Sequence, residues 1–215
     1  NTSSSFNKST EHQSATVGVH NAAISCKVFL NLVGIKEKEG QFFNIKKMRI
    51  ECLKIYTENL QEQKKFYSEV LQLPVKQTSE EEIEIQIGFS VLKIRQNTTA
   101  TPYHIAFHIP SKQEKNALQW LKQRVSILKN EEDEIIDFPA WKAKSIYFYD
   151  ADKNVMEFIS RQHIFPSASE EFSAKSIVGI AEIGVATNDV KKAFKFLNQK
   201  IGLEKFTGDY EHFCA

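Results

Sequence analysis

The stretch Ser145–Ser160 contains an acidic side chain inside an otherwise apolar strand pattern. Strict alternation places Glu157 on one strand face together with Val155 and Ile159. A carboxylate with apolar neighbours is costly to bury unless another group hydrogen-bonds to it or neutralises it. We therefore expect the face that carries Glu157 to be a functional site.

Two histidines and a cysteine add reactive groups on other predicted strands. His104 and His108 share one face of the predicted strand Tyr103–Ile109, whose other face is apolar. Cys52 lies on the predicted strand Ile50–Thr57 and would be a nucleophile only beside a base such as His104. A lone buried cysteine is more often an inert, small apolar side chain.

Composition excludes several classes of partner. The 215 residues are 41% hydrophobic and 26% charged with a net charge of +1, which gives no argument for a nucleic-acid or membrane partner. The three cysteines have no regular spacing, which argues against a disulfide framework and fits a reducing compartment. No apolar run approaches the ~20 residues of a membrane span. We therefore expect a cytoplasmic protein.

The elements that must position these groups form a repeated pattern. A strand, a capped helix and three further strands begin near Met48, with Asn59 as the helix cap. The same order begins again at Tyr103, with Ser111 as the predicted cap, and ends with the strand Val155–Ile159. A third copy begins with the strand Ile180–Thr187, followed by a helix with Asp189 as the predicted cap.

This repeat predicts the domain organisation. Residues 1–47 are predicted to be a disordered or loosely structured extension, because their first part is polar and has little to bury. Residues 48–162 form one complete domain of two units. Residues 163–176 are a polar linker, and residues 177–215 are the truncated start of a second domain.

The hairpin Phe148–Phe158 carries a family resemblance. Its sequence, FYDADKNVMEF, resembles the closing hairpin F-x-D-P-D-G-N-x-x-E-F of the vicinal oxygen chelate (VOC) superfamily, with Ala151 and Lys153 in place of the usual Pro and Gly. This superfamily includes glyoxalase I, bleomycin and fosfomycin resistance proteins and extradiol dioxygenases. The resemblance implies an α+β fold of paired βαβββ modules around a cupped cavity, as in dihydroxybiphenyl dioxygenase.

The resemblance also implies a set of metal-ligand positions, which fall on Cys52, Lys93, His104 and Glu157. His104 and Glu157 have the ligand types of the family. Lys93 cannot ligate while it is charged, and Cys52 stands where the family usually has His or Gln. The candidate ligands for a divalent Zn, Fe, Mn or Ni ion are therefore His104, Glu157 and Cys52.

Further residues are predicted to line the cavity or to hold an equivalent position in the incomplete copy. Lys93, His108 and Tyr56 are predicted cavity residues, and Tyr147 either lines the cavity or is an ordinary strand residue. Glu182 occupies the first-strand ligand position of the third copy.

Two functions remain open from the sequence. The first is a small-molecule binding protein of the VOC type, in which the metal site of the complete domain is degenerate. The second is a metal-dependent VOC enzyme, a lyase or dioxygenase, with His104 and Glu157 as ligands. A homodimer is also left open by the resemblance.

Overall fold

The structure is a computed structural model that describes residues 25–28, 49–162, 164–166, 171–202, 204–205 and 208–211. Most of the predicted extension 1–47, including the polar stretch Asn1–Gly18, lies outside the described residues. The predicted last strand, His212–Ala215, also lies outside them.

The first module is a four-stranded sheet covered by a helix. Its strand order is β2-β5-β4-β3, and the first and last strands of the module, β2 and β5, run parallel. The helix α1 continues without a break into a π-helical turn. In chain order the elements are β2 (Cys52–Thr57), α1 (Leu60–Lys65), the π-helix (Phe66–Val70), β3 (Val75–Ser79), β4 (Glu82–Ile87) and β5 (Ser90–Gln96).

The second module repeats this topology. Its first and last strands, β6 and β10, are parallel neighbours, and β9 follows antiparallel to β10. Two short strands, β7 and β8, share the outer edge of β9. The elements are β6 (His104–Ile109), α2 (Glu114–Lys122), β7 (Ile127–Leu128), β8 (Ile136–Phe138), a 3-10 turn (Pro139–Trp141), β9 (Ala143–Tyr149) and β10 (Val155–Arg161).

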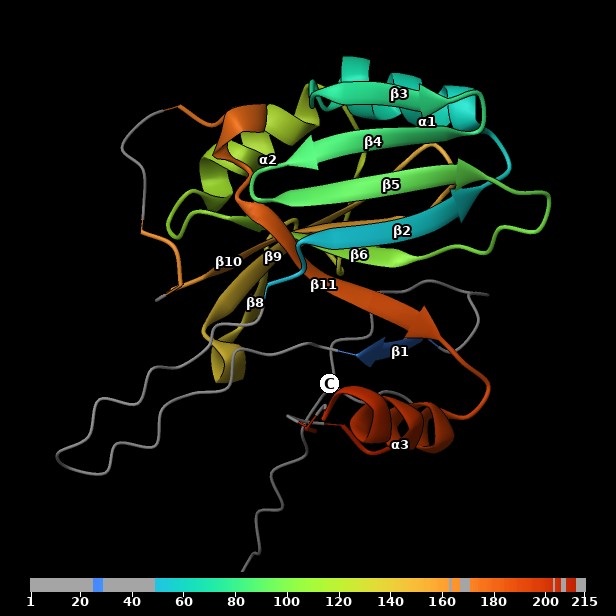
Figure 1. The fold of residues 1–215 in the computed structure, drawn as a ribbon. Helices are drawn as coiled ribbons and strands as arrows, with labels where there is room; N and C mark the ends of the chain where they lie inside the picture. Colours follow the sequence, from blue (N-terminus) through green and yellow to red (C-terminus); the bar gives the residue numbers. More distant parts are fainter. Residues whose placement is uncertain are drawn as a thin grey trace, which may run out of the picture.

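The described residues therefore form the predicted pair of βαβββ modules, followed by the strand and helix of an incomplete copy. The two module helices lie at the same end of the molecule (Figure 1). The remaining elements are β1 (Ser25–Val28), a 3-10 turn (Ala174–Ser176), β11 (Gly179–Ala186) and α3 (Val190–Ile201).

Two of the three predicted helix caps are confirmed. The side chains of Asn59 and Asp189 accept hydrogen bonds from backbone N–H groups in the first turns of α1 and α3. The predicted cap Ser111 is wrong, because its hydroxyl donates to the carbonyl of Phe165 and α2 begins later, after Gln113. A tertiary partner has thus taken the side chain that local spacing assigned to the helix.

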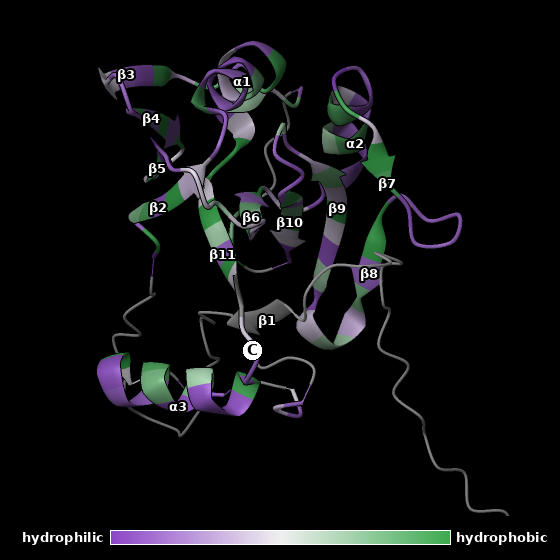
Figure 2. Cartoon of the chain, turned by 90° about the vertical axis from the view of Figure 1, so that its right-hand side faces the viewer, coloured by the Kyte–Doolittle hydropathy of each residue, from purple (hydrophilic) through white to green (hydrophobic). Residues whose placement is uncertain are grey.

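The core lies between the two sheets and their helices. Alternate residues of β4, β5, β6 and β10 point into it, among them Ile85, Leu92, Phe107 and Phe158, which are fully buried. Helix α1 packs against β4 and β5, and α2 packs against β9. Figure 2 shows the first sheet on one side of this arrangement and the second sheet on the other.

Strand β11 is built into the boundary between the modules. It pairs antiparallel with β6 on one edge and with β1 on the other. Its Ile180 N–H donates to the hydroxyl of Ser90 at 2.8 Å, and the N–H of Phe89 donates to the carbonyl of Val178 at 2.9 Å. The strand that the repeat assigns to the start of a second domain is therefore hydrogen-bonded to both modules of the first domain.

Close backbone approach explains one glycine at this junction. Gly88 has a left-handed φ of +52°, and a Cβ built on it would lie 1.9 Å from the carbonyl oxygen of Val178. On the other side, a Cβ on Gly179 would lie 2.5 Å from the ring of Phe89. The β4–β5 turn therefore requires glycine at position 88, where the neighbour is backbone, whereas the neighbour of Gly179 is the far end of the Phe89 side chain, which can move.

Across the part of the chain that the structure covers, no helix has the length and apolarity needed to cross a membrane.

Candidate functional site

A buried histidine–carboxylate pair lies on the face of the second sheet that points away from the helices. Nε2 of His104 on β6 lies 2.7 Å from Oε2 of Glu157 on β10, and both residues are almost fully buried. The hydroxyl of Ser145 on β9 donates to the other oxygen, Oε1, at 2.6 Å. Both oxygens of the carboxylate that the sequence singled out therefore have protein partners, which offsets the cost of burying it.

Tyr147 adds a neutral hydroxyl beside this pair. Burial raises the pKa of Tyr147 well above its usual value, and the negative charge of Glu157 raises it further. Its ring centroid lies 6.2 Å from that of His104. The tyrosine is therefore protonated at any physiological pH and can donate a hydrogen bond.

An ion pair crosses the same face from β10 to β11. The guanidinium of Arg161 bonds to Oε1 of Glu182, and the side chains are only 13% and 4% exposed. Glu182 lies on β11 opposite Ala106 of β6, so the pair spans three neighbouring strands. The incomplete third copy thus contributes a charged group to the face that carries His104 and Glu157.

His108 lies on the same face, one repeat further along β6. Burial lowers its pKa from 6.5 to about 3, and the positive charge of Arg161 lowers it further, against an opposing effect of Glu157. The ring is therefore neutral at physiological pH. Its centroid lies 4.9 Å from that of Phe165, in an edge-to-face contact.

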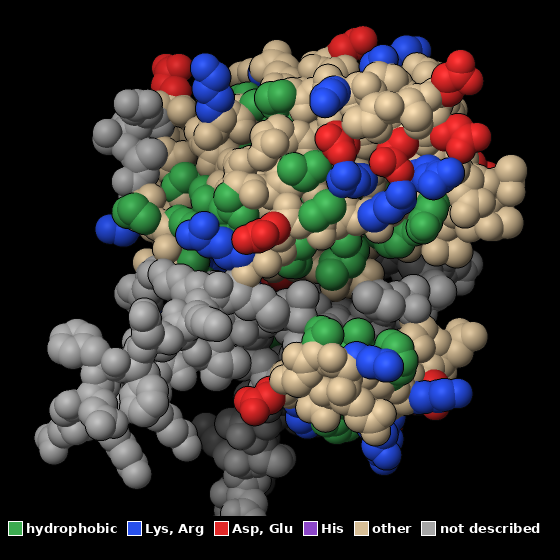
Figure 3. Space-filling view, viewed as in Figure 1, with side chains coloured by type: hydrophobic (Ala, Val, Ile, Leu, Met, Phe, Trp, Pro, Cys, Tyr) green, Lys and Arg blue, Asp and Glu red, His purple; other side chains and the backbone are tan. Residues whose placement is uncertain are grey.

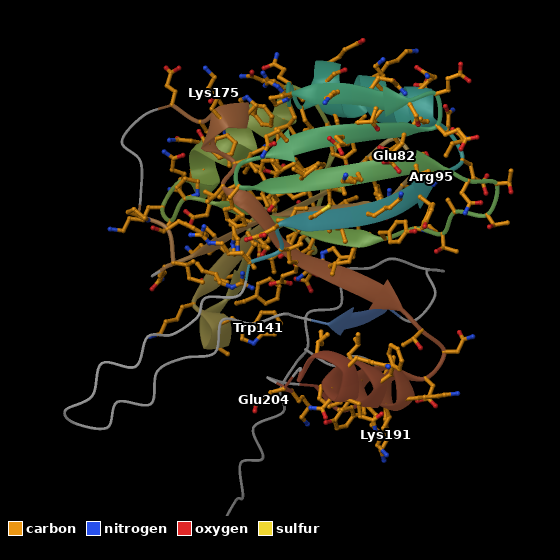
Figure 4. The ribbon with its side chains drawn as sticks, viewed as in Figure 1. Glu82, Arg95, Trp141, Lys175, Lys191 and Glu204 are labelled. Atoms are coloured by element: carbon orange, nitrogen blue, oxygen red, sulfur yellow. The ribbon has the colours of Figure 1, made fainter. Side chains whose placement is uncertain are left out.

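Small side chains separate these polar groups. A buried cluster of alanines with Ile159 occupies the middle of the face, and the rings of Phe138 and Trp141 pack against it. These two rings are stacked with centroids 5.4 Å apart, and Trp141 is labelled at its place in the fold in Figure 4. The alanines are Ala106, Ala143 and Ala181.

Three predicted site residues lie elsewhere. Cys52 and Tyr56 are on exposed positions of the first sheet, where Tyr56 is 39% exposed. The ammonium of Lys93 lies 2.6 Å from Oε1 of Glu84, on the same exposed face. Figure 3 shows acidic and basic side chains side by side on this surface. The contacts described for His104 and Glu157 include neither Cys52 nor Lys93.

The described residues do not fit a divalent metal ion. Among them, no group of three or more His, Cys, Asp and Glu side chains has the arrangement of a metal site. The one candidate carboxylate, Glu157, already binds His104 and Ser145 through its two oxygens. A catalytic metal requires about three protein ligands and an open position.

Sequence reasoning identified part of this face and missed part of it. It did not assign Ser145 or Arg161 to the site, although alternation places Arg161 on the same strand face as Glu157, four residues away. Glu182 was expected to belong to a separate domain. Its contribution follows only from the pairing of β11 with β6.

No protein-family model and no curated protein matches the chain. Among solved structures, it is similar to an integron cassette protein from the mobile metagenome of the Halifax Harbour sewage outfall, with 15% identity, a TM-score of 0.46, and coverage of 52% of this chain and 97% of that one. A glyoxalase/bleomycin resistance protein/dioxygenase from Nocardioides shows 16% identity and a TM-score of 0.43, covering 59% and 92%. The fosfomycin resistance protein FosX from Listeria monocytogenes shows 18% identity and a TM-score of 0.41, covering 54% and 93%.

These identities and TM-scores carry no inference about activity. The assignment of the fold rests on the strand orders and on the parallel pairs β2–β5 and β6–β10 of the molecule itself.

Proposed function

We propose that this chain, whose two complete modules have the paired βαβββ fold of the VOC superfamily, binds a small molecule without a metal ion. The binding face is the one that carries His104, Glu157, His108 and the Arg161–Glu182 pair. The observation that carries the proposal is the engagement of both Glu157 oxygens by His104 and Ser145.

A metal ion at Glu157 would have to replace hydrogen bonds that already compensate a buried charge. Such an ion would break the hydrogen bonds of His104 and Ser145 to Glu157, and each of these buried groups would then need a new partner. The imidazole of His104 and the carboxylate of Glu157 leave a divalent ion short of ligands, because no third His, Cys, Asp or Glu among the described residues joins them in a metal-binding arrangement. We therefore infer a structural and electrostatic role for the His104–Glu157 pair instead of metal binding.

The composition of the face supports a small-molecule ligand. Sites for small molecules are mostly apolar and contain a few fixed polar groups that orient the ligand. Here alanines and aromatic rings pack beside a small number of buried or nearly buried polar side chains, among them the bonded groups Glu157, Arg161 and Glu182. The identity of the ligand, a homodimer and a cytoplasmic location stay predictions.

The test is a calorimetric titration of the metal-stripped full chain with Zn²⁺ and with Mn²⁺. We expect no one-to-one binding tighter than about 10 μM, because only two suitable ligands converge. The variants Glu157→Gln and Glu84→Gln form a matched pair, since Glu84 is a carboxylate on the other sheet.

Sub-micromolar binding that Glu157→Gln abolishes and Glu84→Gln preserves would refute the metal-free proposal. It would instead support the alternative, a metal-dependent lyase or dioxygenase with His104 and Glu157 as ligands. Weak binding that is the same in both variants would be adventitious and would leave the proposal standing.

A further inference from the structure

One ring nitrogen of His108 is a buried polar atom without a hydrogen bond in the described part of the chain. The residue is 6% exposed, and within the described structure Nδ1 has no hydrogen-bond partner. Buried polar atoms are nearly always hydrogen-bonded, and the rare exceptions call for an explanation. A ligand group that completes this hydrogen bond would recover the cost of having removed that nitrogen from water.

The charges around His108 are already compensated. Arg161 is paired with Glu182, and Glu157 is bonded to His104 and Ser145. A ligand that brought a further charge into this buried face would have to be desolvated without a free counter-charge among these groups. An uncharged ligand meets no such cost.

Apolar side chains lie around the His108 ring, next to these paired charges. The edge-to-face contact with Phe165 covers one side of the His108 ring. Ile159 lies opposite His108 on the neighbouring strand, and the buried cluster to which Ile159 belongs also contains Ala106 and Ala181. Aromatic rings such as that of Phe165 favour contact with a flat apolar group.

We propose that the ligand is an uncharged, largely apolar molecule whose hydroxyl group hydrogen-bonds to Nδ1 of His108, beside the Arg161–Glu182 ion pair contributed in part by β11. This inference rests on the proposed small-molecule function and specifies the ligand's chemical class. A hydroxyl suits the site because it can donate or accept, and so pairs with either neutral tautomer of the imidazole.

The test compares probes of one size and different charge on the full chain, in the presence of EDTA. Benzyl alcohol, benzoate and benzylamine are titrated while the ring signals of ¹³C-labelled histidine are followed by NMR. The signal that disappears in His108→Asn identifies His108. We expect benzyl alcohol to shift this signal saturably in the millimolar range, and the two charged probes to bind at least about 10-fold more weakly.

Two variants examine the hydrogen bond itself. His108→Phe keeps an aromatic ring but removes Nδ1, and should weaken benzyl alcohol binding about 3- to 10-fold, as read from the fluorescence of the two tryptophans. Tyr56→Phe, on the exposed face of the other sheet, should leave it unchanged. The charge comparison uses the wild-type chain, so it does not depend on whether His108→Phe folds.

The inference is overturned if benzoate or benzylamine binds as tightly as benzyl alcohol, or if no probe shifts the His108 signal at concentrations up to about 50 mM. It is also overturned if a folded His108→Phe variant binds benzyl alcohol with unchanged affinity. None of these results involves metal binding, so failure here is distinct from the metal titration that would refute the proposed function.

Discussion

At the scale of single residues, buried charges on the second sheet are held by specific partners. Arg161 and Glu182 are nearly buried, so each depends on the other to offset its desolvation. The exposed pair Lys122–Glu134 has similar chemistry, but its lysine side chain is 42% exposed. These two pairs provide a comparison between buried and solvated ion pairs in one molecule.

We predict that Arg161→Met lowers the free energy of unfolding by roughly 3–5 kcal/mol, because it leaves the Glu182 carboxylate buried without its guanidinium partner. Lys122→Met should cost no more than about 1 kcal/mol, since exposed pairs contribute little. Urea denaturation followed by circular dichroism measures both values. Equal effects of the two substitutions would show that Arg161 is solvated in solution.

His108 should make stability depend on pH. Its pKa is about 3 in the folded chain and near 6.5 when unfolded, so between these values the unfolded state binds more protons. The stabilisation is fully present above pH 6.5 and is lost as the pH falls towards 3. Arg161 opposes protonation, and Glu157 favours it.

We predict that the wild-type chain loses roughly 2 kcal/mol more stability than His108→Asn between pH 7.5 and pH 5, at 1.36 kcal/mol per pKa unit. Urea titrations of both proteins at the two pH values give this difference. Because the two proteins are compared by how their free energies of unfolding change with pH, the cost of the substitution itself and the titration of other groups drop out. Parallel slopes would mean that His108 is protonated in the folded chain.

The sequence predicts some of these neighbours and not others. Period-two alternation is enough to place His104 and Glu157 on one face, and their 2.7 Å contact agrees with it. Alternation within each sheet does not specify how two sheets are placed relative to one another. For that reason it could not show that Cys52 and Lys93 lie on a separate exposed face.

At the scale of elements, the β9–β10 turn is organised by one carboxylate. Asp150 accepts hydrogen bonds from the backbone N–H groups of Asp152 and Asn154 and from the side chains of Asn154 and Gln63. Gln63 belongs to α1, so this turn also ties the second module to the first. The resemblance to the superfamily hairpin therefore reflects a local hydrogen-bond network as well as a sequence pattern.

We predict that Asp150→Ala destabilises the chain by about 3 kcal/mol or more, because several buried donors lose their acceptor at once. Lys153→Gly is the matched control in the same turn. Lys153 has a φ of +65°, so glycine relieves strain while it adds freedom to the unfolded chain, and the net change should lie within about 1 kcal/mol. Thermal unfolding of the two variants decides whether the network or the turn conformation dominates.

Elements were predictable where local chemistry decides them. Asn59 and Asp189 cap their helices as their spacing indicates, because the partner N–H groups lie three residues away. Ser111 has the same spacing but bonds to Phe165, which is 54 residues away. A competing partner at that distance leaves no signal in the local sequence.

At the scale of the whole molecule, β11 joins parts of the chain that the repeat assigned to separate domains. The alternation of apolar and polar residues along a strand identifies its two faces, but it does not identify which strands will pair with its edges. Strand β6 has an edge that β11 occupies, and Ser90 bridges β11 to the first module. This docking could therefore not be derived from the period of the sequence.

The junction provides a direct test of the docking. We predict that Gly88→Ala lowers stability by several kcal/mol, since its Cβ would overlap the carbonyl of Val178 at a position that also has positive φ. Gly202→Ala has a similar φ of +68° but no atom within 4 Å of its Cβ, so it should cost only about 1–2 kcal/mol. The difference between the variants in urea denaturation measures the fit of β11, and equal costs would show that β11 is not docked in solution.

The continuity of the core leads to a last prediction about cooperativity. One hydrophobic cluster contains residues of both modules, such as Ile85 and Phe158, and also Ile177 and Ile180 from the segment of β11. Because each part buries apolar surface against the others, opening one part exposes surface of its neighbours. We expect the two modules and β11 to unfold in a single transition. Amide exchange in β11 should then be protected to the same free energy as in β6, measured by native-state hydrogen exchange with increasing urea. A lower opening free energy confined to residues 177–186 would instead mean that β11 detaches before the modules unfold, and Glu182 would then leave the binding face independently of the fold.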